Sequence, residues 1–240
     1  MKNLKLLIML FSISFVAISQ EAKDEGFMYK NEIGVDIIDI IDGTLQVSYE
    51  RALGKNFSFN IGVGYKTEEG LIRLSGIDRP RLKTGDITYH GIKIIPEVRY
   101  YISKTQSERL DGFYLGAYLK HNAFQSDFDG IYTDSQDIDY DFLFDTKLKV
   151  TSVGFMVGYK LPIGKRFTID FLIAGPGVVW HDYSMKNKKD LPDEFYDDLN
   201  EALENYFESL NIEFRLSQLN ERIDFILPSF RYGVSLGYSF

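Results

Sequence analysis

The sequence contains no cysteine among its 240 residues. It therefore has no disulfide framework, no thiolate zinc site, no cysteine nucleophile and no lipidated N-terminal cysteine. It also has no basic excess: 27 Lys and Arg stand against 35 Asp and Glu, a formal net charge of −8 with a pI near 5.0. A general nucleic-acid binder needs that excess to neutralise phosphates, so we expect no nucleic-acid partner.

Long apolar runs are also missing after the first 19 residues. Lys2 and Lys5 provide a positively charged start, Leu6 to Ile18 is apolar except for two serines, and Ala17-Ile18-Ser19 places small residues before Gln20. This pattern is typical of a secretory signal peptide, and the run is shorter than the ~20 residues that a membrane anchor needs. We expect residues 1–19 to be removed and residues 20–240 to form one exported domain.

The exported part is dominated by a period of two. Apolar and polar or small residues alternate, as in Phe57, Phe59 and Ile61 against Ser58 and Asn60. One face is large and apolar and the other is small and polar, a pattern that membrane β-barrels show in segments of about ten residues. Eight segments follow it, namely 32–37, 45–50, 57–66, 92–100, 113–120, 152–159, 169–174 and 226–240.

The connections between these segments alternate in length. Short ones (53–56, about 103–111 and 162–165) alternate with long ones (67–86, 124–146 and 181–225), except for a tight turn at Asp42-Gly43. Outer-membrane barrels have short periplasmic turns and long extracellular loops. The sequence therefore predicts an all-β fold, a closed eight-stranded antiparallel transmembrane β-barrel with both termini in the periplasm. A soluble sandwich or barrel remains the alternative, because periodicity does not say which face is inside.

Three phrases carry a resemblance to a known family. Tyr232-Gly-Val-Ser-Leu-Gly-Tyr238-Ser-Phe240 resembles the C-terminal strand by which outer-membrane barrels are recognised by their assembly machinery. Val47-Ser-Tyr-Glu-Arg51 and Pro96-Glu-Val-Arg-Tyr-Tyr101 resemble phrases in small eight-stranded outer-membrane proteins of Gram-negative bacteria, of the OmpA/OmpX-like type. The resemblance spans about residues 30–240. It implies a location in the outer membrane, with lipids and the assembly machinery as partners and Tyr238 and Phe240 in the assembly signal, but it implies no catalytic residues.

Charged residues of both signs fall on the polar face. An eight-stranded barrel is just wide enough inside for side chains to fill it. We therefore expect a structural charge network that plugs the interior, and a narrow solute pore is the alternative. The expected network consists of Glu50, Lys93, Glu97, Arg99, Lys120, Asp170 and Arg231, with Asp36 on the same face.

No motif indicates an enzyme or a cofactor site. His90, His121 and His181 have no metal-ligand spacing, and there is no nucleophile elbow or phosphate-binding glycine loop. Some eight-stranded outer-membrane barrels are lipid A-modifying acyl hydrolases with a surface His/Ser pair. His181 and Ser184 are the nearest match here, and a place in an interfacial aromatic belt explains this histidine better. We expect no catalytic activity and no cofactor.

Two of the long connections have features of their own. The connection 124–146 carries seven aspartates, from Asp127 to Asp145. They suggest calcium ligands, although the EF-hand pattern fails and an extended strand with one wet face explains them equally well. The connection 185–222 contains a predicted helix, with Asp190 as its cap and Pro192 in its first turn. It carries an apolar stripe at helical spacing: Phe195, Leu199, Ala202, Leu203, Tyr206 and Leu210.

The helix has three candidate places: over the barrel mouth, which we favour, on the acidic connection, or on a partner. Function is expected in these loops, in a structural or surface-binding role that involves an extracellular or envelope protein.

Overall fold

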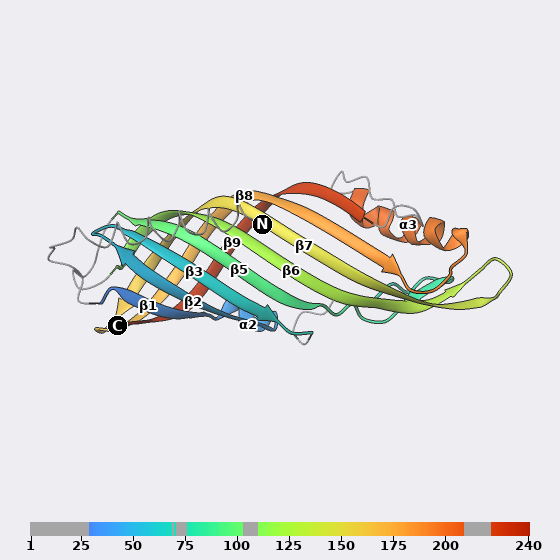
Figure 1. The fold of residues 1–240 in the computed structure, drawn as a ribbon, viewed down its shortest axis with the longest axis horizontal. Helices are drawn as coiled ribbons and strands as arrows, with labels where there is room; N and C mark the ends of the chain where they lie inside the picture. Colours follow the sequence, from blue (N-terminus) through green and yellow to red (C-terminus); the bar gives the residue numbers. More distant parts are fainter. Residues whose placement is uncertain (1–28, 69, 71–75, 103–109, 209–221) are drawn as a thin grey trace, which may run out of the picture.

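The computed structural model describes residues 29–68, 70, 76–102, 110–208 and 222–240. The predicted signal peptide lies outside the described residues. The fold is mostly antiparallel β-sheet (Figure 1). Its elements are β1 (Asn31–Asp36), α2 (Ile38–Ile41), β2 (Thr44–Leu53), β3 (Phe57–Lys66), β4 (Leu82–Thr84), β5 (His90–Tyr101), β6 (Gly112–Thr133), β7 (Asp139–Ile163), β8 (Phe167–Asn187), α3 (Asp193–Glu208) and β9 (Arg222–Ser239).

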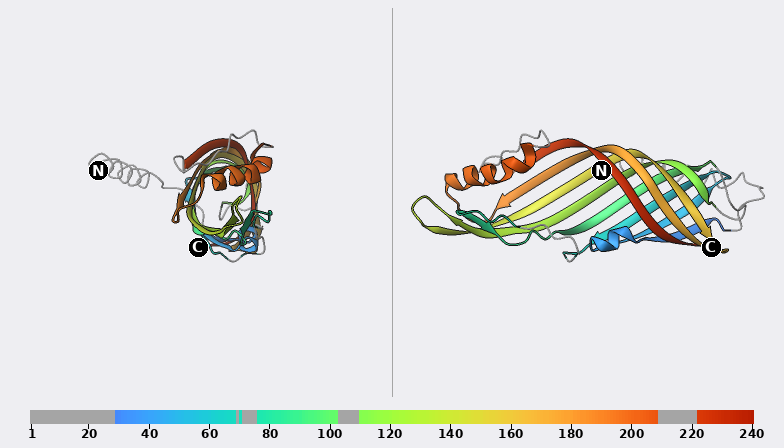
Figure 2. Two further views of the ribbon diagram at one scale, coloured as in Figure 1. Left: turned by 90° about the vertical axis from the view of Figure 1, so that its right-hand side faces the viewer. Right: turned by 180° about the vertical axis from the view of Figure 1, so that it is seen from behind.

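The strand pairings return on themselves. Each strand pairs with the next in the order β1, β2, β3, β5, β6, β7, β8 and β9. The last strand, β9, pairs with β1 and closes the sheet. Seen end-on in Figure 2, the strands make a closed circuit. We call this circuit the ring. Closure leaves no free edge among its eight strands. No helix among the described residues is both long and apolar enough to cross a bilayer.

The short connections lie at the end of the ring that holds the first residue of β1 and the C-terminus. Residues 54–56 join β2 to β3, and residues 164–166 join β7 to β8. Gly54 and Gly164 have positive φ angles of 77° and 62°, a conformation that glycine adopts without steric cost. Two of the predicted short connections are therefore present, and most of the third, about 103–111, lies outside the described residues. The predicted alternation fails between β6 and β7, which a short turn at 134–138 joins. The predicted turn at Asp42-Gly43 is also present, but it follows the one-turn helix α2, which the period-two pattern did not predict.

The two faces of the ring have opposite character, as the alternation predicted. On β2, Gln46 and Glu50 are buried inside the ring, whereas Leu45 and Val47 are 61% and 49% exposed on its outside. The same pattern recurs on β7, where Lys160 is buried and Phe155 is 76% exposed. Large apolar residues thus cover the outside of the ring, and its buried charged residues lie inside together with a buried apolar cluster that includes Ile95, Tyr114, Met156 and Leu172.

The count of eight strands was incomplete. The ninth strand, β4, lies within the expected loop 67–86 and pairs with residues 130–132 of β6, outside the ring. The prediction of a loop at 124–146 was also wrong. β6 and β7 continue through it as a paired hairpin up to a turn at 134–138, and β8 continues beside β7 to Asn187. The alternative of an extended strand was therefore the correct one.

Helix α3 packs against this extension and not in the place that we favoured. Its Phe195 ring lies 5.1 Å from the ring of Phe142 and 5.3 Å from that of Tyr132, measured between centroids. We call β4, residues 124–146 and residues 181–208, which include α3, the head. It has its own buried apolar cluster, separate from the ring: Leu82, Tyr132, Phe142, Phe144, Met185, Leu191, Phe195, Tyr196, Leu199 and Ala202.

The helix itself was predicted correctly. Phe195, Leu199 and Ala202 of the apolar stripe are buried, and Leu203 packs at the margin of the same cluster. Leu210 lies outside the described residues, and the side chain of Tyr206 is not described. Arg81, the residue before β4, binds the helix through its guanidinium, which contacts Glu194 at 2.9 Å and Asp198 at 3.1 Å.

Candidate functional site

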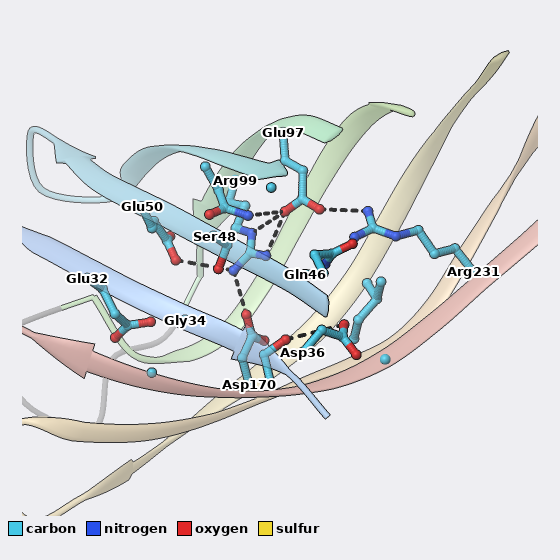
Figure 3. Close-up of a pocket in the computed structure, with 16 residues that line it drawn as sticks. Glu32, Gly34, Asp36, Gln46, Ser48, Glu50, Glu97, Arg99, Asp170 and Arg231 are labelled. Atoms are coloured by element: carbon cyan, nitrogen blue, oxygen red, sulfur yellow. Dashed lines mark hydrogen bonds and ion pairs between the residues drawn. The ribbon is translucent and has the colours of Figure 1, made fainter. Parts of the chain in front are cut away.

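The interior of the ring holds a network of charged side chains centred on Arg99. This residue comes from the inner face of β5, and its guanidinium has three carboxylate partners on three strands. Nη1 lies 2.6 Å from Oδ2 of Asp170 on β8 and 3.2 Å from Oε2 of Glu50 on β2, and Nη2 lies 2.6 Å from Oε2 of Glu97. Figure 3 shows these side chains converging inside the ring. One cation thus connects strands that are not neighbours in the sheet.

Lys160 extends the network toward the end of the ring that holds the first residue of β1 and the C-terminus. Its ammonium lies 2.7 Å from Oε1 of Glu32 on β1 and also binds Oε2 of Glu50. Lys160 and Glu50 are both buried. Neither Lys160 nor Glu32 was among the predicted network residues.

The opposite side of the network is formed by Glu97. Its Oε1 accepts a hydrogen bond from Nη1 of Arg231 at 2.6 Å, and its Oε2 accepts one from Nδ2 of Asn60 at 2.9 Å. Glu97 therefore has a partner for each carboxylate oxygen. A buried charge is tolerated when it is both paired and hydrogen-bonded, and Glu97 meets both conditions.

Two tyrosines complete the coordination of the carboxylates. The Tyr101 hydroxyl donates to Oε1 of Glu50, and the Tyr114 hydroxyl donates to Oδ1 of Asp170, each at 2.8 Å. The guanidinium of Arg99 also lies 4.7 Å from the centroid of the Tyr114 ring. These aromatic side chains fill space that water would otherwise occupy, so the network is held by packing as well as by charge.

The structure brings together five of the seven predicted residues: Glu50, Glu97, Arg99, Asp170 and Arg231. Lys93 is separate, because its partner is Asp39 of α2. Lys120 lies on the same inner face, and within the described part of the chain it forms no ion pair. Asp36 is also outside the network and accepts a hydrogen bond from the backbone amide of Asp39 at 3.0 Å.

The space beside the network is small. A cavity of about 30 Å³ runs along β1, β2 and β9, where glycine and serine alternate with polar and charged inner residues. Figure 3 shows the charged side chains around it. Its small-residue wall consists of Gly34, Ser48, Gly62, Gly233, Ser235 and Gly237. A water molecule needs about 10–15 Å³ by this measure, so the cavity has room for roughly two waters and not for an organic ligand.

His181 and Ser184, the pair considered for the alternative of an acyl hydrolase, do not face each other. His181 stacks on the ring of Phe225, with 4.5 Å between centroids, and Ser184 lies on the opposite face of β8 because three residues separate them. Nδ1 of His121 lies 2.8 Å from the Thr151 hydroxyl on the outer face. His90 pairs with Glu68.

Calcium ligands are not gathered in the head. The aspartates of residues 124–146 lie along the exposed outer side of the hairpin or in its turn, as the burial pattern of β6 and β7 shows. Within the described ranges, no three His, Asp or Glu side chains come close enough together to hold a metal ion.

The two residues of the expected assembly signal lie where the ring closes. The Phe240 amide donates to the Asn31 carbonyl at 2.8 Å, and the Phe240 side chain is 48% exposed. Nη1 of Arg166 donates to the Tyr238 hydroxyl at 2.6 Å. Their role in assembly stays a prediction.

Comparisons with known proteins give one match. No curated protein and no solved structure is significantly similar to the chain. The family model described as "Protein of unknown function (DUF3575)" matches residues 7–217, which is most of the sequence. The chain therefore belongs to the DUF3575 family.

Proposed function

We propose that this protein is an integral outer-membrane β-barrel with a plugged interior, and that the head has a structural or surface-binding role outside the cell. The observation that carries the proposal is the inverted polarity of the ring. Glu97, Arg99 and Lys160 are buried inside, while large apolar side chains such as Phe155 and Phe230 are exposed outside. In water this arrangement would expose the residues that gain most from burial. In a bilayer it places hydrocarbon against them.

The outer face has the height that a bilayer requires. On β7 the outward residues are apolar from Val153 to Ile163, and they give way to Thr151, Lys149 and Lys147. A tilted strand crosses the hydrocarbon core with about 9–11 residues. Trp180 lies directly opposite Thr151 on β8, at the same boundary, where an interfacial tryptophan is expected. β6 and β7 continue well beyond this boundary, which supports a head in the aqueous phase.

The interior supports a plug over the alternative of a narrow pore. Arg99 and Lys160 reach across to Glu50 and close the space between opposite walls, and the remaining cavity holds roughly two waters. On this proposal the partners are the lipids of the outer membrane, the barrel assembly machinery of a Gram-negative bacterium and a protein that binds the head. The proposal includes no catalytic role.

Surface labelling tests the location and the topology. Because the chain has no cysteine, Gln136→Cys in the head and Lys165→Cys in the opposite turn provide matched single-cysteine variants. A membrane-impermeant maleimide should label Gln136→Cys on intact cells and Lys165→Cys only after the outer membrane is permeabilised. Recovery of the native chain from the periplasm as a soluble monomer without detergent would contradict the proposal.

A further inference from the structure

The one-turn helix α2 exposes a compact apolar face at the end of the ring away from the C-terminus (Figure 1). Ile40 and Ile41 are 53% and 49% exposed, and Ile37 before the helix is 39% exposed. Leu45, at the start of β2, continues the same surface. None of these side chains belongs to the buried apolar cluster of the head or to the one inside the ring, as the described residues define them.

The opposite side of α2 is fixed to the interior of the ring. The Asp36 carboxylate accepts a hydrogen bond from the Asp39 amide, and the Asp39 side chain pairs with Lys93. The Gly43 amide closes the turn by donating to the Ile40 carbonyl at 2.9 Å. Because its polar side is held inward, α2 keeps its isoleucines directed outward.

The apolar face of α2 is continuous with the outer face of the ring. Val47 on β2, the strand that follows the helix, and its partner Val63 on β3 are 49% and 47% exposed. The isoleucines of α2 are exposed to the same degree as these residues, which face lipid on the proposed function. β1 has six residues, fewer than the roughly 9–11 that a tilted strand uses to cross the hydrocarbon core. An apolar helix at its end extends the apolar surface on this side.

We propose that α2 is a membrane wedge, whose Ile40 and Ile41 side chains insert among the acyl chains of the outer leaflet while Asp39 stays inside the ring. This inference rests on the proposed function. The occupant of the surface is lipid, because the surface is uncharged and merges with the outer band of the ring. A covering segment of the same chain and a second copy of the protein are the other occupants, and the test below separates them.

Tryptophan fluorescence with brominated lipids tests the wedge. Trp180 is the only tryptophan, so Trp180→Phe gives a silent background in which Ile40→Trp and Ile41→Trp are made separately. Phe155→Trp, on the outer face of the ring, is the lipid-facing control, and Gln136→Trp in the head is the aqueous control. Each folded variant is placed in phosphatidylcholine vesicles with and without bromine on the acyl chains.

We expect Ile40→Trp and Ile41→Trp to emit at shorter wavelength than Gln136→Trp and to be quenched to an extent comparable with Phe155→Trp. Emission like that of Gln136→Trp would overturn the wedge, because the helix would then face water. Short-wavelength emission without quenching would also overturn it. In that case a dependence on the protein-to-lipid ratio would identify a second copy, and its absence would identify a covering segment. If Phe155→Trp itself is not quenched, the proposed function fails and not only the wedge.

Discussion

Lys160 on β7 and Glu32 on β1 meet inside the ring, with 2.7 Å between Nζ and Oε1. β8 and β9 separate the two strands on the shorter way round the sheet. The same ammonium also binds Glu50 on β2. One lysine therefore connects β7 to β1 and β2, strands with which β7 shares no backbone hydrogen bonds. Its removal should destabilise parts of the ring well beyond β7.

Lys160→Met should destabilise the folded ring strongly. The substitution keeps most of the side-chain volume but leaves the carboxylates of Glu32 and Glu50 without their shared cation. Removal of one partner from a buried ion pair costs about 3–5 kcal/mol. Urea unfolding of the protein in lipid vesicles, followed by Trp180 fluorescence, measures the loss.

Lys165→Met is the matched control, since Lys165 lies exposed in the turn between β7 and β8. It should change the free energy of unfolding by less than about 0.5 kcal/mol. Adding Glu32→Gln and Glu50→Gln to Lys160→Met should recover part of the stability, because the uncompensated charges are then removed. Equal unfolding midpoints for Lys160→Met and Lys165→Met would show that the network does not hold the ring.

Most of this network could be predicted from the sequence because strand residues alternate between faces. The alternation placed Glu50, Glu97, Arg99, Asp170 and Arg231 on one face without any knowledge of their partners. Glu32 and Lys160 carried the same signal, since each lies two residues from an inward glycine, Gly34 or Gly158. Both residues were missed because they lie at the ends of their segments, where few neighbouring residues show the alternation.

The sequence did not determine which residues pair. Lys93 and Lys120 share the inner face but not the network, because a contact depends on the height of each strand in the ring and on α2, which supplies Asp39. The head was also only partly predictable. Helical spacing identified the buried side of α3, but periodicity gives a face and not its partner. The partners Tyr132 and Phe142 lie on a hairpin whose sequence fitted a loop equally well.

Phe195→Ala should unfold the head locally and leave the ring intact. Phe195 is fully buried among Tyr132, Phe142 and Phe144, and truncation of a buried phenylalanine costs about 3–5 kcal/mol. Hydrogen exchange should accelerate in α3 and in residues 126–144, with little change in β1, β2 and β9. Ile138→Ala, at an exposed position in the same head, should leave exchange unchanged. Faster exchange throughout the ring would mean that head and ring unfold as one unit.

The hairpin turn at 134–138 should loosen in acid. Hydrogen bonds from the Ile138 and Gln136 amides, at 2.9 and 2.8 Å, lower the pKa of the Asp134 carboxyl below its usual value of 3.8. Because the pKa is lower in the folded state, the charged Asp134 carboxylate stabilises the turn at pH values above the ordinary pKa. This stabilisation is lost as the pH falls through the pKa of the folded state. Amide exchange at Gln136 and Ile138, corrected for intrinsic rates, should therefore accelerate below about pH 4.

Asp134→Asn should abolish that pH dependence, because the side chain no longer titrates. Asp137→Asn is the control, since it leaves Asp134 in place and should retain the acid response. A native turn whose corrected exchange is constant between neutral pH and the acid range would contradict the assignment of Asp134 as the residue that fixes the turn.

A plugged interior predicts that the protein conducts no ions across a bilayer. Arg99 and Lys160 connect opposite walls, and the cavity beside them holds roughly two waters. Purified protein in planar bilayers at neutral pH should therefore show no sustained current. Stable single-channel openings would favour the narrow pore and would require the pairs made by Arg99 to open.

The terminal phenylalanine should matter for assembly more than for the stability of the finished ring. Phe240 is half exposed, and its backbone, not its side chain, closes the sheet through Asn31. Phe240→Ala keeps that hydrogen bond and removes only the aromatic ring. If the C-terminal strand is the assembly signal, the variant should accumulate in the periplasm and reach the outer membrane in reduced amount. The fraction that does assemble should unfold at the same urea concentration as the native protein.

Phe230→Ala is the control. It removes the same side chain from an outward position of β9, where Phe230 is 64% exposed, and this variant should assemble normally. Equal amounts of the two variants in the outer membrane would show that Phe240 has no special part in recognition.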